Sequence, residues 1–118
     1  MPGIAGIIKK TTGDKNKQDM AVMINSMLHE SFYSSGTYIN EQMGVYAGWI
    51  CHKDSFCDCM PVWNEKKNIL LIFVGENFTD LDFFDRLKAK HHQFDNSNAS
   101  YIIHMYEEEG TAFLTDLN

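Results

Sequence analysis

An almost wholly apolar stretch at the N-terminus, MPGIAGII, limits the folds open to this chain more than any other feature. Its isoleucines and its short length are typical of a buried strand, which we expect at Gly3–Lys9. A chain of 118 residues is long enough for one small domain with a modest core and too short for two. The sequence therefore predicts a single domain, residues 1–118, whose first element lies in the core.

The next forty residues predict one helix between two loops. Thr11–Asp19 is polar and rich in turn residues, which predicts a loop. Apolar residues then recur at steps of three and four from Met20 to a helix end near His29. The following stretch, Glu30–Gln42, has no clean period and is interpreted as a loop.

The second half predicts two strands followed by two helices. We expect strands at Val45–His52 and Asn68–Gly75, with a turn over Val62–Asn68. A helix is predicted from Thr79 to about Lys90. Ser97 or Asn98 is expected to cap another helix that ends at Gly110, before a last helical turn with Phe113 and Leu117. Because the middle strands follow one another directly, this order indicates an α+β fold.

The charge and the cysteines restrict the partners and the compartment. The formal net charge of −6 disfavours nucleic acid and anionic membranes as partners. The longest apolar run, Ile69–Val74, is too short to span a bilayer. Three cysteines in a chain that shows no leader fit a reducing compartment, so we expect a cytoplasmic protein.

Four segments follow one another in the order and spacing of a known family. Met1–Ile7 matches "MCGIAGI" except at its second residue, and His29–Gly36 stands in the place of "HRGPDDSG". Trp49–Thr79 aligns without a gap to "RLSIID…QPM…NE…VFNGEIYN", with matches at Asp54, Pro61, Asn64, Glu65, Phe73, Gly75 and Glu76. Ser97–Gly110 is similar to "SDTEVILHLYEEYG". The chain thus resembles the N-terminal glutaminase domain of the asparagine synthetase family, a class II glutamine amidotransferase with the Ntn-hydrolase fold.

The resemblance implies an αββα sandwich of which this chain supplies the first part. The family domain is longer, and the last residues, FLTDLN, contain no closing element. Half of a sandwich would leave apolar strand faces or edges uncovered. We therefore expect a domain that is incomplete at its C-terminus and that self-associates or binds an obligate partner.

The resemblance also implies the residues of a glutaminase site, and this chain lacks most of them. The nucleophilic cysteine, whose own α-amine assists it, falls on Pro2, and the oxyanion-hole asparagine falls on Val74. The arginine that holds the substrate carboxylate falls on Trp49, and the aspartate that holds its amino group falls on Asn98. Gly75 and Glu76 remain, so we expect no catalytic residue and only vestigial substrate contacts at Gly75, Glu76 and Asn98.

These replacements lead to three hypotheses about function. The first is a pseudo-glutaminase, a non-catalytic domain that supports or docks an ATP-dependent amide-forming synthetase in cis or in trans, as in the β-lactam synthetases and lasso-peptide cyclases of this family. The chain holds no ATP-binding "SGGxDS" loop of its own. The second is an active amidotransferase or hydrolase with a relocated nucleophile, at Cys51, Cys57 or Ser31. The third is an amino-acid sensor that binds glutamine or another amino acid through Glu76, the Gly75 N–H and Asn98.

No metal or cofactor site is expected from the sequence. Cys51-His52 and Cys57-Asp58-Cys59 lack the two-residue gaps of zinc pairs, so they are interpreted as free thiols. His91-His92 is expected to complement the C-terminus of the preceding helix, and His104 to be structural. Glu107–Glu109 is interpreted as a solvated face.

Overall fold

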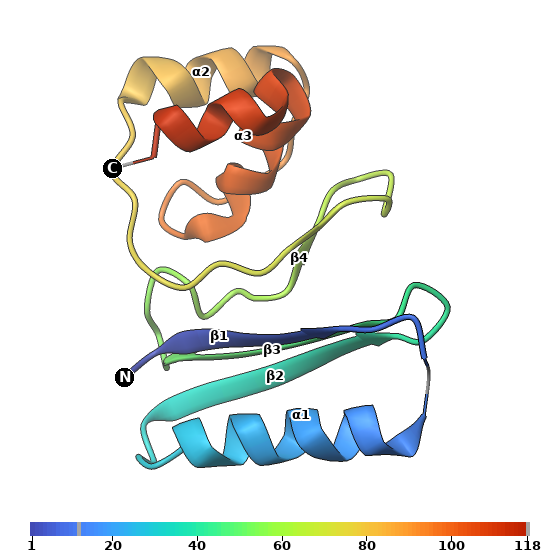
Figure 1. Cartoon of the computed structure of the whole chain (residues 1–118). Helices are drawn as coiled ribbons and strands as arrows, with labels where there is room; N and C mark the ends of the chain where they lie inside the picture. Colours follow the sequence, from blue (N-terminus) through green and yellow to red (C-terminus); the bar gives the residue numbers. More distant parts are fainter. Residues whose placement is uncertain (12, 118) are drawn as a thin grey trace.

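The protein, seen in a computed structural model that describes residues 1–11 and 13–117, has an α+β fold, as the sequence predicts (Figure 1). The first elements are β1 (Gly3–Ile8), α1 (Asp14–Met27), β2 (Tyr33–Asn40) and β3 (Val45–His52). They are followed by β4 (Val62–Trp63), β5 (Leu70–Leu71), α2 (Leu81–Ala89) and α3 (Ile102–Glu109), with 3₁₀ turns at Ala99–Tyr101 and Gly110–Thr115. No helix in the described ranges is long and apolar enough to cross a membrane.

A three-stranded antiparallel sheet forms one half of the molecule, with β3 between β1 and β2. In the register, Gly3 lies opposite Ile50 on one side of β3, and Tyr33 lies opposite His52 on the other. Gly44, in the turn between β2 and β3, has a φ of 66°, and a Cβ there would lie 1.8 Å from the Lys9 carbonyl oxygen. Glycine is therefore required at this turn.

One face of the sheet packs against α1. Tyr46 and Ile50 of β3 are fully buried there, against Met20 and Ile24 of the helix. A Cβ at Gly48 would lie 2.5 Å from the Ile24 side chain, so glycine lets the helix approach the middle strand closely. The regularly spaced apolar residues from which α1 is predicted thus lie on the side of the helix that faces the sheet.

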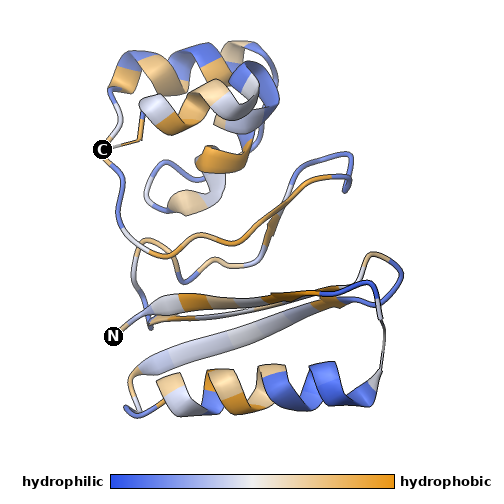
Figure 2. Ribbon diagram, in the orientation of Figure 1, coloured by the Kyte–Doolittle hydropathy of each residue, from blue (hydrophilic) through white to orange (hydrophobic). Residues whose placement is uncertain are grey.

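The other face of the sheet meets the larger core of the protein. Trp49 and Cys51 of β3 pack there against residues of α2, α3 and the β4–β5 hairpin. The hairpin and its flanking segments lie between the sheet and the two helices, which gives four layers: α1, the sheet, the hairpin, and α2 with α3 (Figure 1). Figure 2 shows that the segment after β5, which crosses this middle layer, is hydrophobic along most of its length.

The structure corrects three boundaries expected from the sequence. The predicted loop Glu30–Gln42 contains β2, because hydrogen bonding to β3 holds its polar sequence YSSGTYIN extended. Helix α1 begins at Asp14, inside the predicted loop Thr11–Asp19, of which Thr12 lies outside the described residues. The predicted strand Asn68–Gly75 pairs only at Leu70–Leu71, and its partner β4 occupies the start of the predicted turn Val62–Asn68.

The predictions for the last two helices are largely confirmed. Asn98 caps the turn that leads into α3, since its side-chain oxygen accepts a hydrogen bond from the Ser100 N–H at 2.9 Å. Gly110 ends α3 with a φ of 59°, a positive value that glycine adopts at no steric cost. Helix α2 begins two residues after Thr79, which instead donates a hydrogen bond to the Tyr101 hydroxyl at 3.3 Å.

Candidate functional site

The four positions on which the resemblance places absent glutaminase residues are spread over three layers of the structure. Pro2 is half-buried at the start of β1. Trp49 is buried in the core, and its ring lies against Gly36. A Cβ added at Gly36 would lie 2.3 Å from the Trp49 ring. Val74 packs at the edge of the same core, and the Asn98 side chain is engaged as a helix cap.

The two residues that the family pattern retains are both exposed. Gly75 has a φ of 141°, and Glu76 follows it on the surface. No hydrogen bond within residues 1–11 and 13–117 joins Gly75 or Glu76 to Pro2 or to Asn98. In the described part of the chain, no hydrogen-bond network therefore connects the two retained residues to Pro2 or Asn98.

The cysteines lie in or against the larger core, where Cys51 also contacts the Ser34 hydroxyl at 3.2 Å. Cys51 and Cys57 are buried, and Cys59 is half-buried. Burial is the main cause that raises the pKa of the Cys51 thiol, and it also raises that of Cys59. His52 points away from Cys51 to the surface and stacks on Phe32. These surroundings disfavour a thiolate at Cys51 and keep Cys51 and His52 on opposite sides of the strand.

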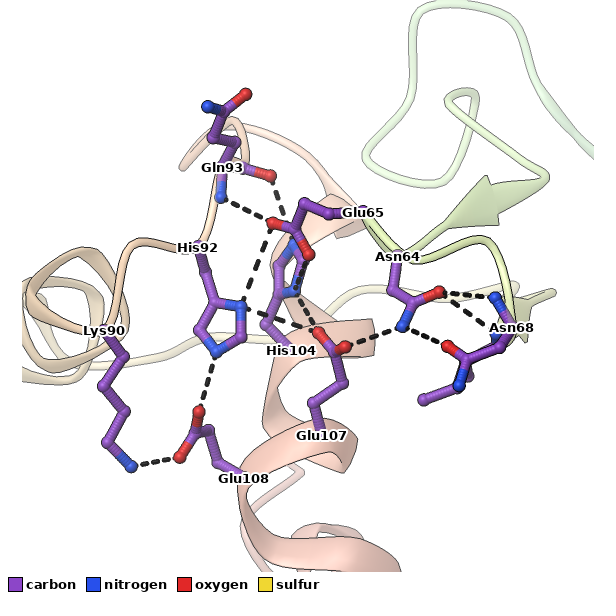
Figure 3. Close-up of polar contacts among 10 residues, drawn as sticks. Asn64, Glu65, Asn68, Lys90, His92, Gln93, His104, Glu107 and Glu108 are labelled. Atoms are coloured by element: carbon purple, nitrogen blue, oxygen red, sulfur yellow. Dashed lines mark hydrogen bonds and ion pairs between the residues drawn. The ribbon is translucent and has the colours of Figure 1, made fainter.

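A cluster of two histidines and two glutamates forms the most distinctive polar feature of the described chain. Its members are Glu65 in the β4–β5 turn, His92 after α2, and His104 and Glu107 of α3 (Figure 3). One donor atom from each of the four lies within 4.8 Å of all the others. We call these residues the His–Glu cluster.

His104 is the buried centre of the His–Glu cluster. Its Nδ1 lies 2.7 Å from Glu107 Oε2 and 3.8 Å from Glu65 Oε2. Its Nε2 lies 3.1 Å from the Gln93 carbonyl oxygen. Because a carbonyl only accepts hydrogen bonds, the Nε2 atom carries a proton and Nδ1 faces the carboxylates.

His92 stacks on His104, with ring centroids 4.5 Å apart. Its Nδ1 lies 3.5 Å from Glu107 Oε2 and 3.9 Å from Glu65 Oε1. Its Nε2 lies 2.7 Å from Glu108 Oε1, and the other oxygen of Glu108 contacts the Lys90 ammonium group. Both imidazoles thus have one nitrogen directed at the two glutamates and the other held by an outer partner (Figure 3).

Asn64 fixes Glu107 from the hairpin side. Its amide nitrogen donates to Glu107 Oε1 and to the Asn68 side-chain oxygen, each at 2.7 Å. Its own side-chain oxygen accepts from the backbone N–H groups of Asn68 and Ile69. Asn64 is only 2 % exposed, so this network ties the β4–β5 turn to α3 inside the protein.

The surroundings favour charged carboxylates in this cluster. Burial, the largest influence, acts to raise the pKa of Glu107, but the hydrogen bond from Asn64 and the contact with the His104 ring hold it below its usual range. Burial likewise acts to raise the pKa of Glu65, and the backbone N–H of Gln93, which donates to its Oε1 at 3.0 Å, holds it low. The pKa of Glu108 is lowered mainly by Lys90 and then by His92.

The cluster refines the expectations from the sequence. Glu107 does not belong to a solvated face, because it is half-buried and its carboxylate binds Asn64 and His104, whereas Glu108 is exposed as expected and binds His92. The His92 ring contacts these glutamates of α3, while the backbone N–H groups of His91 and His92 donate to the Lys88 and Leu87 carbonyls at the C-terminus of α2, as expected. The sequence predicts no metal site, yet two imidazole nitrogens and two carboxylates that converge in this way form a donor set typical of divalent transition metals.

An open cavity of about 420 Å³ adjoins the cluster. His92, Glu107 and Glu108 line it from the cluster side, and Asn68 and Tyr106 contribute to its other walls. The cluster is therefore reachable from solvent although His104 itself is buried.

Comparison with known proteins gives no assignment: no family profile matches the chain, and no curated protein matches it either.

Proposed function

We propose that this chain is a pseudo-glutaminase, a non-catalytic domain that supports or docks an ATP-dependent amide-forming synthetase. The observation that carries the proposal is Trp49. The resemblance implies an arginine that holds the substrate at this position. The Trp49 ring instead fills the core beside Gly36, and the residue is only 5 % exposed. A buried indole offers neither charge nor access to a free amino acid.

The order of layers supports the fold that the resemblance implies. Helix, sheet, second sheet and helices follow one another across the molecule, as they do in an αββα sandwich (Figure 1). The N-terminal strand lies in the larger of the two sheets, and β4 with β5 forms the other. We infer an Ntn-hydrolase-like arrangement whose second sheet is reduced to one short hairpin.

The remaining positions support loss of catalysis. Pro2 has no thiol or hydroxyl to attack an amide. Val74 offers no side-chain donor to a developing oxyanion. The Asn98 side-chain oxygen is already bound to the Ser100 N–H, so it caps a helix in place of holding a substrate.

Ammonia release from glutamine tests the proposal against an active enzyme with a relocated nucleophile. We expect the full chain to release no ammonia above the buffer rate, and alkylation of its cysteines to change nothing. Glutamine-dependent release that is lost on alkylation, and also in Cys51→Ser or Cys57→Ser, would identify that cysteine as the nucleophile and contradict the proposal. Release that survives alkylation but is lost in Ser31→Ala would do the same for Ser31.

Calorimetry with glutamine tests the amino-acid sensor. We expect no saturable heat at millimolar glutamine, because Trp49 leaves the carboxylate without a cation. Saturable binding that weakens in Glu76→Gln and strengthens in Trp49→Arg would favour the sensor instead. The supporting role itself is tested by the coding sequence after codon 118 and by adjacent genes, where we expect an "SGGxDS" synthetase.

A further inference from the structure

We propose that Glu65, His92, His104 and Glu107 bind a single divalent transition-metal ion, which joins the β4–β5 turn, the segment after α2, and α3. The inference concerns a part of the chain that the proposed function does not use, and it stands or falls separately. It rests on where protons can be placed in the His–Glu cluster, on the distances between its donor atoms, and on the outer partners of both histidines.

The contacts of His104 call for either a proton or a metal ion beside its Nδ1 atom. Nε2 must donate to the Gln93 carbonyl oxygen at 3.1 Å. A neutral ring then presents the lone pair of Nδ1 to a Glu107 oxygen 2.7 Å away, and two acceptors repel each other at this distance. Either a second proton on Nδ1 or a metal ion bound by both atoms must therefore separate His104 Nδ1 from the Glu107 oxygen.

His92 presents a second Nδ1 lone pair to the same two carboxylates, at 3.5 Å from Glu107 and 3.9 Å from Glu65. Its Nε2 lies 2.7 Å from a Glu108 oxygen, so Nε2 carries the proton when the ring is neutral. Its Nδ1 then points to Glu107 and Glu65. If both rings took up a second proton, two imidazolium ions would stack at 4.5 Å, whereas one divalent ion shared by both Nδ1 atoms leaves both rings neutral.

The separations between the donor atoms suit one ion better than direct hydrogen bonds. Three of the four contacts between an Nδ1 atom and the carboxylates of Glu65 and Glu107 span 3.5 to 3.9 Å, which is too long for hydrogen bonds. Ligands about 2.1 Å from a tetrahedral ion lie roughly 3.4 Å apart. The fourth contact, between His104 Nδ1 and Glu107 Oε2, is shorter at 2.7 Å, and these two atoms would move slightly apart when the ion binds.

The outer partners are those of a metal site. A histidine that binds a metal usually donates its other N–H to a carboxylate or a backbone carbonyl, which fixes the orientation of the ring. Here Glu108 holds His92 and the Gln93 carbonyl holds His104. Asn64 holds the second oxygen of Glu107, so the ligand carboxylate is oriented as well.

The donor set selects the class of ion. Two imidazoles disfavour Mg²⁺ and Ca²⁺, which prefer oxygen ligands alone. Two nitrogens and two carboxylates suit Zn²⁺ and neighbouring first-row ions, and the two carboxylate charges balance one such ion. Four protein ligands fill a tetrahedral zinc site, so we assign the ion a structural part.

Titration of the metal-free full chain with Zn²⁺, followed by calorimetry, tests the proposal. We expect one ion per chain, bound at least about 100-fold more weakly by Glu107→Gln and by His92→Gln. The matched control is His91→Asn, a change at the exposed histidine next to His92. Asparagine is chosen because it tolerates the positive φ of 67° that the backbone has at residue 91. The affinity of this variant should equal that of the wild type.

Two spectroscopic readouts make the test independent of whether the variants fold. In the wild-type chain, ¹⁵N spectra should show Zn²⁺ shifting the Nδ1 signals of two histidines while the Nε2 signals keep their protons. Co²⁺ should give the visible bands of a tetrahedral site without a sulfur charge-transfer band. Absence of saturable binding, or unchanged Nδ1 signals with a sulfur band that alkylation removes, would overturn the proposal.

Discussion

The two halves of this protein are held together by different kinds of contact. In the sheet half, residues 3–52, backbone hydrogen bonds join every strand to its neighbour over six to eight residues. In the helical half, residues 53–117, the one ladder spans two residues on each strand, and side chains such as Asn64, Glu107 and Tyr101 join the segments. A single substitution can remove a side-chain contact but not a backbone ladder. The helical half is therefore the part that point mutations can take apart.

The largest effect is expected from Asn64→Ala. The change leaves the N–H groups of Asn68 and Ile69 and the Glu107 carboxylate without their buried partner, which costs about 3 kcal/mol of unfolding free energy. Urea denaturation measures this loss. The control is Asn25→Ala on the exposed side of α1, where we expect no loss. Equal effects of the two changes would contradict the contrast between the halves.

Gly36→Ala tests the sheet half by crowding it. A Cβ on Gly36 would lie 2.3 Å from the rigid Trp49 ring, so we expect a loss of about 2 kcal/mol. Gly6→Ala is the matched control, because its Cβ would meet only the Tyr46 carbonyl at an ordinary 3.8 Å. Thermal unfolding should separate the two variants, and a stable Gly36→Ala variant would show that Trp49 is loosely held.

Tyr101→Phe removes one hydroxyl from the helical half. This hydroxyl accepts from the Asn77 amide at 2.9 Å and donates to the Asn77 carbonyl, so its loss should cost about 1 kcal/mol. The exposed Tyr106 provides the matched control as Tyr106→Phe, for which urea denaturation should show no change. A larger loss for Tyr106 would mean that α3 is held mainly from its outer side.

The smallest effect concerns Asp58, which links the two halves. Hydrogen bonds from the Ser34 hydroxyl and then from the Asp54 N–H lower its pKa below the usual 3.8. Since the folded pKa is the lower one, this contribution is complete above about pH 4 and is lost as the pH falls further. Ser34→Ala should flatten the fall in stability below pH 4, as urea midpoints measured from pH 2 to 6 would show. An unchanged pH profile would contradict this role of Asp58.

The parts of the fold that the sequence predicts are those whose pattern is local. The apolar run of β1, the spacing of α2 and α3 and the cap at Gly110 need no distant partner to be recognised. Strand β2 is missed because YSSGTYIN shows no regular alternation of polar and apolar residues, and only its pairing with β3 makes it a strand.

The His–Glu cluster is missed for the same reason, since its four residues come from three separate segments. One local signal exists: His104 and Glu107 are three residues apart on α3 and so share a face of the helix. Nothing in the sequence around Glu65 or His92 points to that face. Their approach follows from the packing of the hairpin and of the segment after α2 against α3.

The close connection between β2 and β3 has a consequence for the order of folding. Four residues, Glu41 to Gly44, join the two strands, and the Gly44 N–H closes this turn on the Glu41 carbonyl at 3.1 Å. Strand β1 reaches the other side of β3 only after α1 and β2 intervene in the chain. Because closing a long loop costs more entropy than closing a short one, the β2–β3 hairpin should nucleate the domain, and docking of the N-terminal strand should come later.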